Sequence, residues 1–122
     1  MKLQPDRSDV QTISGHGDHW ISVAGERIGH SVLIGSRGQR LPWPAEHFEQ
    51  LGTAHFDLVA SQGAEIVIFG SGARLRFPPP VWLASLMARR IGLETMDTAA
   101  ACRTYNILAA EGRNVLAALL LR

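Results

Sequence analysis

The sequence of 122 residues lacks the features that mark most secreted and membrane-spanning proteins. It has one cysteine, Cys102, which cannot form an internal disulfide, so the fold is not cross-linked and suits a reducing compartment. Residues 1–7 are polar and do not resemble a secretory signal. No apolar run approaches the about 20 residues that span a membrane. We therefore expect a cytoplasmic protein without a membrane segment.

A dominant charge of one sign is also missing. The chain has 12 basic and 11 acidic residues, a formal net charge of +1, and this balance gives no general attraction to nucleic acid or anionic lipid. Hydrophobic residues make up 46% and charged residues 19%, as in globular proteins. We expect residues 10–122 to form a single domain after a loose leader over residues 1–9, with no nucleic-acid partner.

The first half of the chain predicts a β-meander, in which short apolar runs are separated by glycine-containing turns. Pro42 and Pro44 exclude residues 41–44 from the interior of a sheet, because proline has no N–H. Pro44 is suited to begin a short helical turn that extends to Leu51. The expected strands are 10–14, 19–23 and 31–34, and the expected turns are 15–18 and 24–26.

The second half predicts strands that alternate with helices. Residues 65–69 are apolar on both faces, which is typical of a strand covered on both sides, and residues 70–72 end it. Short apolar strands are expected again at 93–96 and 115–121. This order predicts an α/β fold: a three-layer domain with a central mixed β-sheet, in which the N-terminal meander is followed by a βαβαβ unit.

Two helices are expected between these strands. The first begins at Pro80, ends near Ile91 and stops at Gly92. The second has Asp97 or Thr98 as its N-cap and stops at Gly112. The apolar faces of the two helices are Leu83, Leu86, Met87 and Ile91, and Ala101, Tyr105 and Leu108.

From residue 70 onward the sequence resembles a known family. The matching segments are Gly70-Ser71-Gly72, a proline-led helix, Gly92 to Thr98, Ala101 to Leu108, and Glu111 to Val115. The resemblance is to a family of small α/β domains of unknown activity that includes mitochondrial complex I assembly factor three and the adipogenesis-associated domain protein of animals, with short bacterial and archaeal relatives. It covers about residues 10–122 and is sharpest over 92–115. This chain looks like a bacterial-type member.

The resemblance implies a three-layer fold with a central mixed sheet, no known catalytic residues and no known cofactor. The chain has Ser71 where many relatives are expected to have threonine, a change that keeps the hydroxyl. A role in complex I assembly, through protein contacts, belongs to the eukaryotic relative and is not carried over directly.

A ligand site is one hypothesis for the end of the 65–69 strand. Ligands in open α/β sheets lie beyond the carboxyl ends of strands, where glycine loops and helix starts present N–H groups. The candidate ligand-binding residues are Gly70, Ser71, Gly72, Asp97, Thr98 and Arg103, with Arg74 and Arg76 able to add charge. The alternative is a tight turn beside a capped helix, because no complete phosphate-binding motif is present.

Other chemistry-bearing residues are isolated. Cys102 lies near a helix start, but no histidine follows it, and a small buried thiol is the alternative. His16, Asp18 and His19 are metal-ligand types in a glycine turn, yet no further ligand motif accompanies them, so a solvated turn is the better interpretation and no metal is expected.

Trp43 and Trp82 are candidate partner-binding residues, because interface hot spots favour tryptophan. The alternative is that both close the core. We expect a non-enzymatic interaction or assembly domain with a protein partner and no cofactor. The second hypothesis is a ligand-binding protein or enzyme that uses the residue 70–72 loop and the Asp97 helix start. The oligomeric state is not predicted.

Overall fold

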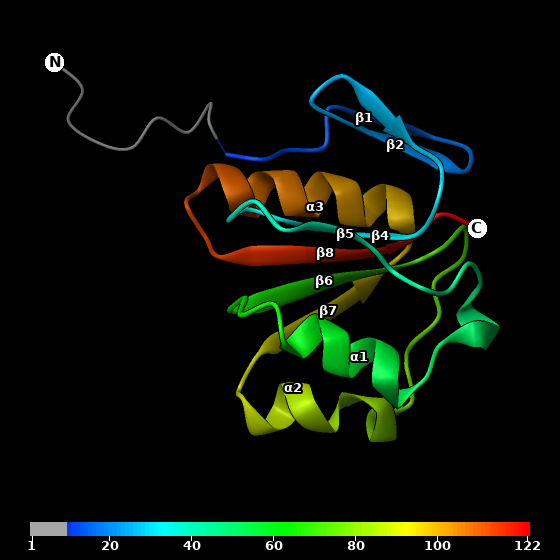
Figure 1. Ribbon diagram of the computed structural model, residues 1–122, viewed down its shortest axis with the longest axis vertical. Coiled ribbons are helices and arrows are strands. Elements are labelled where there is room, and N and C mark those ends of the chain that lie inside the picture. The colour runs from blue at the N-terminus through cyan, green and yellow to red at the C-terminus, as the bar shows by residue number, and fades with distance from the viewer. Residues whose placement is uncertain (1–9) are drawn as a thin grey trace, which may run out of the picture.

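The computed structural model describes residues 10–122, and the leader expected over residues 1–9 lies outside them (Figure 1). The central element is a five-stranded sheet with the strand order β5-β4-β8-β6-β7. The strands β6, β7 and β8 are mutually parallel where they pair, whereas β4 is antiparallel to both β5 and β8. The strand bounds are β4 (Val32–Gly35), β5 (Arg40–Pro42), β6 (Ile66–Ser71), β7 (Gly92–Met96) and β8 (Val115–Leu120).

Helices cover both faces of this sheet. Helix α3 (Thr98–Ala110) lies on one face, while α1 (Thr53–Ala60) and α2 (Ala84–Ala88) lie on the other, as Figure 1 shows. The side chains of β6 alternate accordingly: Ile68 belongs to the core beside α3, and Val67 and Phe69 belong to the core beside α1 and α2. The expected α/β three-layer architecture with a mixed sheet and a βαβαβ unit is therefore confirmed.

The meander does not join the central sheet as a whole, which corrects the expectation. The strands β1 (Gly15–Gly17), β2 (Trp20–Val23) and β3 (Glu26–Ile28) form a separate antiparallel sheet in the order β1-β2-β3. Figure 1 shows this small sheet beyond α3, at the end of the molecule opposite α2. Its apolar side chains pack into the core of α3, so the small sheet covers that helix.

The start of the meander differs from prediction. Residues 15–17 form β1 rather than a turn, and the chain reverses one step later at Asp18–His19, where His19 has φ +64°. Residues 10–14 are extended but form no strand. They are held by the Asn106 side chain, whose Oδ1 accepts from the Ile13 N–H at 2.8 Å.

The segment between β5 and β6 also departs from the pattern. Pro42 is the last residue of β5, which is tolerated because β5 is an edge strand. No helix begins at Pro44; a 3-10 helix η2 (Phe48–Gln50) forms instead. Helix α1 was not predicted, and it supplies Phe56, which is fully buried beside the sheet.

The helix expected from Pro80 to Ile91 is broken in two. A 3-10 helix η3 (Pro80–Leu83) precedes α2, which ends at Ala88. Within α2, Leu86 is buried while Met87 is 62% exposed, so Met87 does not belong to the buried face as expected. The left-handed residue that ends this segment is Arg90, with φ +56°, rather than Gly92, which begins β7.

Candidate functional site

The predicted loop and helix start lie against each other at one edge of the central sheet. The Gly72 N–H donates to the Thr98 hydroxyl at 2.9 Å, and the Thr98 N–H donates to the Gly72 carbonyl oxygen at 2.9 Å. The strands β6 and β7 are parallel neighbours, so their carboxyl ends meet at this edge. We call this junction of residues 70–72 with residues 97–98 the strand-end junction.

Glycine is required at two positions of the strand-end junction. A Cβ on Gly70 would lie 2.9 Å from the Thr98 hydroxyl oxygen and 2.9 Å from a methyl carbon of Leu119. Gly72 has φ +100°, and a Cβ there would lie 2.4 Å from the Arg122 carbonyl oxygen. Close packing of α3 and β8 on β6 accounts for Gly70, and the left-handed backbone beside the Arg122 carbonyl accounts for Gly72, so neither glycine requires a ligand.

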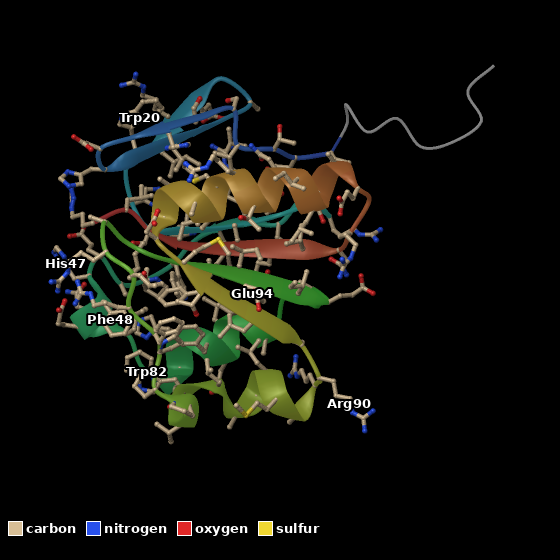
Figure 2. All side chains as sticks on the ribbon, turned by 180° about the vertical axis from the view of Figure 1, so that it is seen from behind. Trp20, His47, Phe48, Trp82, Arg90 and Glu94 are labelled. Atoms are coloured by element: carbon tan, nitrogen blue, oxygen red, sulfur yellow. The ribbon has the colours of Figure 1, made fainter. Side chains whose placement is uncertain are left out.

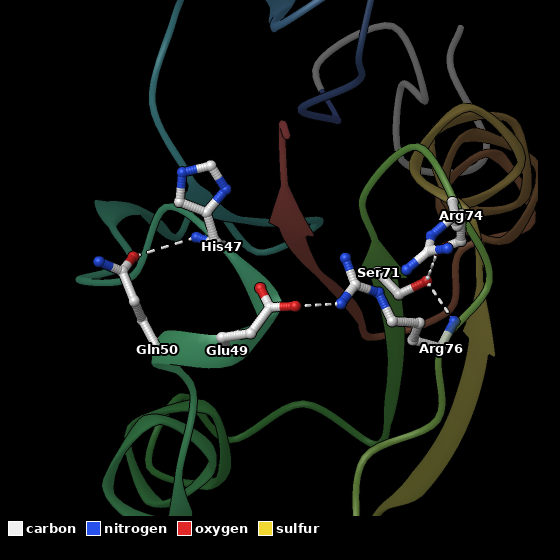
Figure 3. Close-up of polar contacts among 6 residues, drawn as sticks. All are labelled: His47, Glu49, Gln50, Ser71, Arg74 and Arg76. Atoms are coloured by element: carbon white, nitrogen blue, oxygen red, sulfur yellow. Dashed lines mark hydrogen bonds and ion pairs between the residues drawn. The ribbon is translucent and has the colours of Figure 1, made fainter.

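The polar groups of the strand-end junction are used within the fold. The Thr98 hydroxyl accepts from Gly72 and donates to the Leu120 carbonyl oxygen. The Ser71 hydroxyl is fully buried, donates to the Arg74 carbonyl oxygen at 2.6 Å and accepts from the Arg76 N–H at 3.0 Å (Figure 3). The Asp97 carboxylate accepts from the Ala100 N–H at 3.0 Å. These contacts engage the hydroxyls of Ser71 and Thr98 and one oxygen of the Asp97 carboxylate within the fold.

A pocket of about 170 Å³ lies beside the strand-end junction, between it and the β1–β2 hairpin. Of the six predicted ligand-binding residues, Gly72, Asp97 and Thr98 line it, whereas Gly70 and Ser71 are buried beneath it. Arg103 is exposed further along α3 and does not line the pocket. The residues of the β1–β2 hairpin that line the pocket were not predicted, because only tertiary folding brings them there. We call them the hairpin wall, and they are His16, Gly17, Asp18, His19 and Trp20.

The histidines of this wall do not assemble a metal centre with their neighbours. His16, Asp18 and His19 are all exposed. Across residues 10–122, no group of three or more histidine, cysteine, aspartate or glutamate side chains is placed to hold a metal ion. Catalytic zinc sites use three protein ligands and structural sites four, and the described side chains of the wall do not converge in such a number.

Cys102 is a buried apolar side chain in this structure. It is 1% exposed on the inner face of α3. Desolvation raises the pKa of the Cys102 thiol to about 11, although Arg103 nearby opposes the shift. The thiolate is the nucleophilic form, so at neutral pH this thiol is unreactive.

The two tryptophan candidates differ in accessibility. Trp43 is 2% exposed, its indole N–H donates to the His55 carbonyl oxygen at 3.1 Å, and its ring packs edge-to-face on Phe56 and Phe69. Trp43 therefore closes the core and offers no surface. Trp82 is half-buried and stacks on Phe56, with ring centroids 6.0 Å apart, so one side of it remains at the surface.

Exposed apolar side chains gather in the segment that follows β6. Of the five large hydrophobic residues that are exposed among residues 10–122, four lie between positions 75 and 87, and the fifth is Ile107 on α3. Sequence reasoning missed them, because it assigned Met87 to a buried face and read no role into the others. The four are Leu75, Phe77, Val81 and Met87, with exposures of 53%, 68%, 71% and 62%.

Arg76 fastens this segment to the rest of the domain. Its guanidinium forms an ion pair with Glu49, as Figure 3 shows. It also lies over the Phe48 ring, 5.1 Å from the centroid. The hydrogen bond from Arg76 lowers the pKa of the Glu49 carboxyl below its usual value of 4.5. The neighbouring 3-10 helix is held by Gln50, whose Oε1 accepts from the His47 N–H at 3.1 Å.

The chain matches the model of a known protein family. The model of the family described as "Protein of unknown function (DUF498/DUF598)" matches residues 13–120. The chain belongs to this family. The resemblance drawn from the sequence is thereby confirmed, because relatives of this DUF498/DUF598 member include proteins named as complex I assembly factors.

Three proteins are similar to this DUF498/DUF598 chain over most of its length. An uncharacterized protein of Rhodobacter capsulatus is 32% identical over 96% of this chain and 90% of its own length. NADH dehydrogenase [ubiquinone] 1 alpha subcomplex assembly factor 3 of Bos taurus is 34% identical over 97% of this chain, which spans 65% of the bovine protein. A crystal structure of a Bordetella parapertussis protein has 35% identity and a TM-score of 0.85, covering 91% of this chain and 95% of that one.

A further DUF498/DUF598 relative bears on location. The "13 kDa major membrane protein" of Francisella tularensis is 29% identical over 57% of this chain and 57% of its own length. Within residues 10–122, none of the helices has the length and apolar character needed to cross a membrane.

Proposed function

We propose that this chain is a non-enzymatic protein-interaction domain of the assembly type. The observation that carries the proposal is the gathering of exposed apolar side chains at Leu75, Phe77, Val81 and Met87. Large exposed apolar side chains that cluster in one region mark interaction sites, whereas singly scattered ones carry no such meaning. Trp82 lies half-buried within the same segment and adds an aromatic anchor of the kind that interface hot spots use.

The strand-end junction supports the proposal, because most of its polar groups are hydrogen-bonded within the chain. Ser71, Thr98 and Asp97 direct their polar atoms to backbone groups of the same chain. Cys102 is buried with a raised pKa, so the described residues offer no activated nucleophile at this thiol. Ligand chemistry at the strand-end junction is therefore less favoured than protein contact elsewhere.

The assembly part of the proposal rests on named relatives. The bovine relative carries the name of an assembly factor for NADH dehydrogenase, and this chain spans about two thirds of its length. A protein that assists assembly by binding other proteins needs an accessible contact surface and does not need a catalytic centre. Residues 75–87 offer such a surface, because they include four of the five large apolar side chains that are exposed among residues 10–122.

The test is affinity purification of the tagged full chain from cells that encode it, together with NADH dehydrogenase activity in a deletion strain. We expect a reproducible protein partner that is lost in the double variant Phe77→Ser/Val81→Ser. The matched control is Ile107→Ser, which changes an equally exposed apolar residue on α3. Absence of any partner, with normal NADH dehydrogenase assembly in the deletion strain, would rule the proposal out.

We also propose a cytoplasmic location for the chain. Balanced charge and the absence of a long apolar run in the sequence support it. Fractionation of cells that express the tagged full chain measures this directly. Recovery of the chain in the membrane fraction, resistant to high salt, contradicts the proposed location and agrees with the name of the Francisella relative.

A further inference from the structure

The segment that exposes the apolar side chains also carries charge of one sign only. Residues 73–91 contain four of the 12 basic residues of the protein and none of its 11 acidic ones. All four are arginines: Arg74, Arg76, Arg89 and Arg90. The rest of the chain is correspondingly acidic, so the excess positive charge belongs to this segment.

Three of the four arginines keep their charge available. Arg76 is neutralised by its ion pair with Glu49. Among the described residues, Arg74 and Arg90 form no ion pair, and Arg89 makes a hydrogen bond of 2.9 Å to a neutral group, the Ala60 carbonyl oxygen. Within residues 10–122, the Asp57 carboxylate also contacts the segment, where it accepts a hydrogen bond from the Ser85 hydroxyl. Arginines without an ion pair among the described residues therefore stand on both sides of the exposed apolar residues along the chain, with Arg74 before Leu75 and Arg89 and Arg90 after Met87.

Arg90 stands where a glycine would be easier to accommodate. Its φ of +56° is a left-handed conformation at the end of α2, the position at which helices most often place glycine. Figure 2 shows Arg90 and Trp82 at opposite ends of the η3–α2 segment, so the cationic side chain lies at one end of the surface and the aromatic ring at the other.

We propose that residues 73–91 bind an acidic segment of a partner protein, one that presents apolar side chains between carboxylates. This inference rests on the proposed function and adds to it the surface and the chemistry of the partner. The apolar side chains of the partner pack on Phe77, Val81 and Met87, and its carboxylates pair with Arg74 and Arg90. We call residues 73–91 the arginine-flanked surface.

Composition favours a protein over other occupants. Protein interfaces are enriched in arginine, methionine and aromatic residues and depleted in lysine, aspartate and glutamate, which is the composition of residues 73–91. Arginine also fits carboxylates with two parallel hydrogen bonds. A second copy of this chain is a poor occupant, because a two-fold interface would set arginines against arginines. Lipid-binding clusters use about four to eight basic residues, more than the three free ones here.

The experiment places a photo-reactive benzoylphenylalanine at position 77 or 87 of the full chain in cells, with position 107 as the matched exposed control. We expect cross-links to one protein from positions 77 and 87 and not from 107. The cross-linked peptide of that protein should contain aspartate or glutamate beside apolar residues. Cross-links to lipid, or between two copies of this chain, would overturn the inference.

Affinity measurements with the purified cross-linked protein then test the charge. The double variant Arg74→Ala/Arg90→Gly should weaken binding by roughly tenfold or more and reduce its dependence on salt. Arg90→Gly relieves the left-handed strain, so the fold should be as stable as the original or more stable. The control variant Arg103→Ala removes an exposed arginine from α3 and should leave binding unchanged.

The outcomes separate the two proposals. A partner that cross-links at positions 77 and 87, but whose affinity is unaffected by the changes at positions 74 and 90, leaves the proposed function standing and overturns the arginine-flanked surface. No protein cross-link at any of the three positions, and no partner in affinity purification, overturns both.

Discussion

Two neighbouring segments at the end of β6 differ in how they contact the rest of the molecule, because one is buried and hydrogen-bonded and the other is exposed. At the strand-end junction, Ser71 and Gly72 are buried and bonded to Arg76, Thr98 and their neighbours. A few residues later, in the arginine-flanked surface, Phe77 is 68% exposed. Polar residues in a glycine loop can therefore be structural, while exposed apolar residues a few positions later remain available to bind a partner.

The largest contrast should come from two phenylalanines on either side of the junction. Phe69→Ala removes a fully buried ring that packs on Trp43 and Phe56, and should cost about 3–5 kcal/mol of unfolding free energy. Phe77→Ala should change it by no more than about 0.5 kcal/mol. Urea unfolding of both variants measures the difference. Similar losses for the two would show that the 73–91 segment belongs to the core.

The hydroxyl of Thr98 should give the next largest effect. Thr98→Val leaves the Gly72 N–H and the Leu120 carbonyl oxygen without this partner, which should cost about 1–3 kcal/mol. Thr98→Ser keeps the hydroxyl and should recover most of the loss. Thermal unfolding of the pair measures the contribution of the hydrogen bonds. Equal stability of the valine and serine variants would mean that they contribute nothing.

A smaller loss is expected at the helix cap. Asp97→Ala removes the acceptor of the Ala100 N–H and should cost about 1 kcal/mol, whereas Asp97→Asn should be nearly neutral, because asparagine caps helices equally well. Denaturant titration of both variants distinguishes capping from a requirement for negative charge. A loss as large for asparagine as for alanine would point to the charge.

The smallest effect should come from the ion pair that fastens the exposed segment. The pKa of Glu49 is lowered by Arg76, so the pair stabilises the fold above pH 4.5, the unfolded value, and this contribution is lost as the pH falls through the lowered pKa. Glu49→Gln should therefore reduce the Tm slightly at pH 7 and not at all at strongly acidic pH. The control Glu111→Gln, at an exposed position without an ion pair among the described residues, should show no such dependence.

Much of the fold was predictable, because its signals are local. The strands β6 and β8 are apolar on both faces, and α3 has a capping residue, Asp97, at its start. Helix α1 was missed because its eight residues include Thr53 and Val59, which are β-branched, and its N-cap Gly52 has no side chain to mark the start. The separate three-stranded sheet was missed because strand pairing depends on tertiary context.

The candidate site was predictable only as far as topology fixes it. Parallel strands bring Gly72 and Thr98 to one edge, and that meeting follows from the order of the elements. The use of the hydroxyls within the fold depends on distances that no pattern encodes. The exposure of Met87 is not fixed by helical spacing alone, because its neighbour Leu86 takes the buried position in the same short helix.

The position of β8 in the sheet has a consequence for biosynthesis. This strand is the last element along the chain and lies between β4 and β6, so Val32 pairs with Leu119 across most of the sequence. Before β8 is synthesised, β4 and β6 lack the strand that pairs with both of them, so the central sheet cannot close. Closure of the sheet therefore joins residues far apart in the sequence, and pairing of this kind slows folding and leaves strand edges open to aggregation in the meantime.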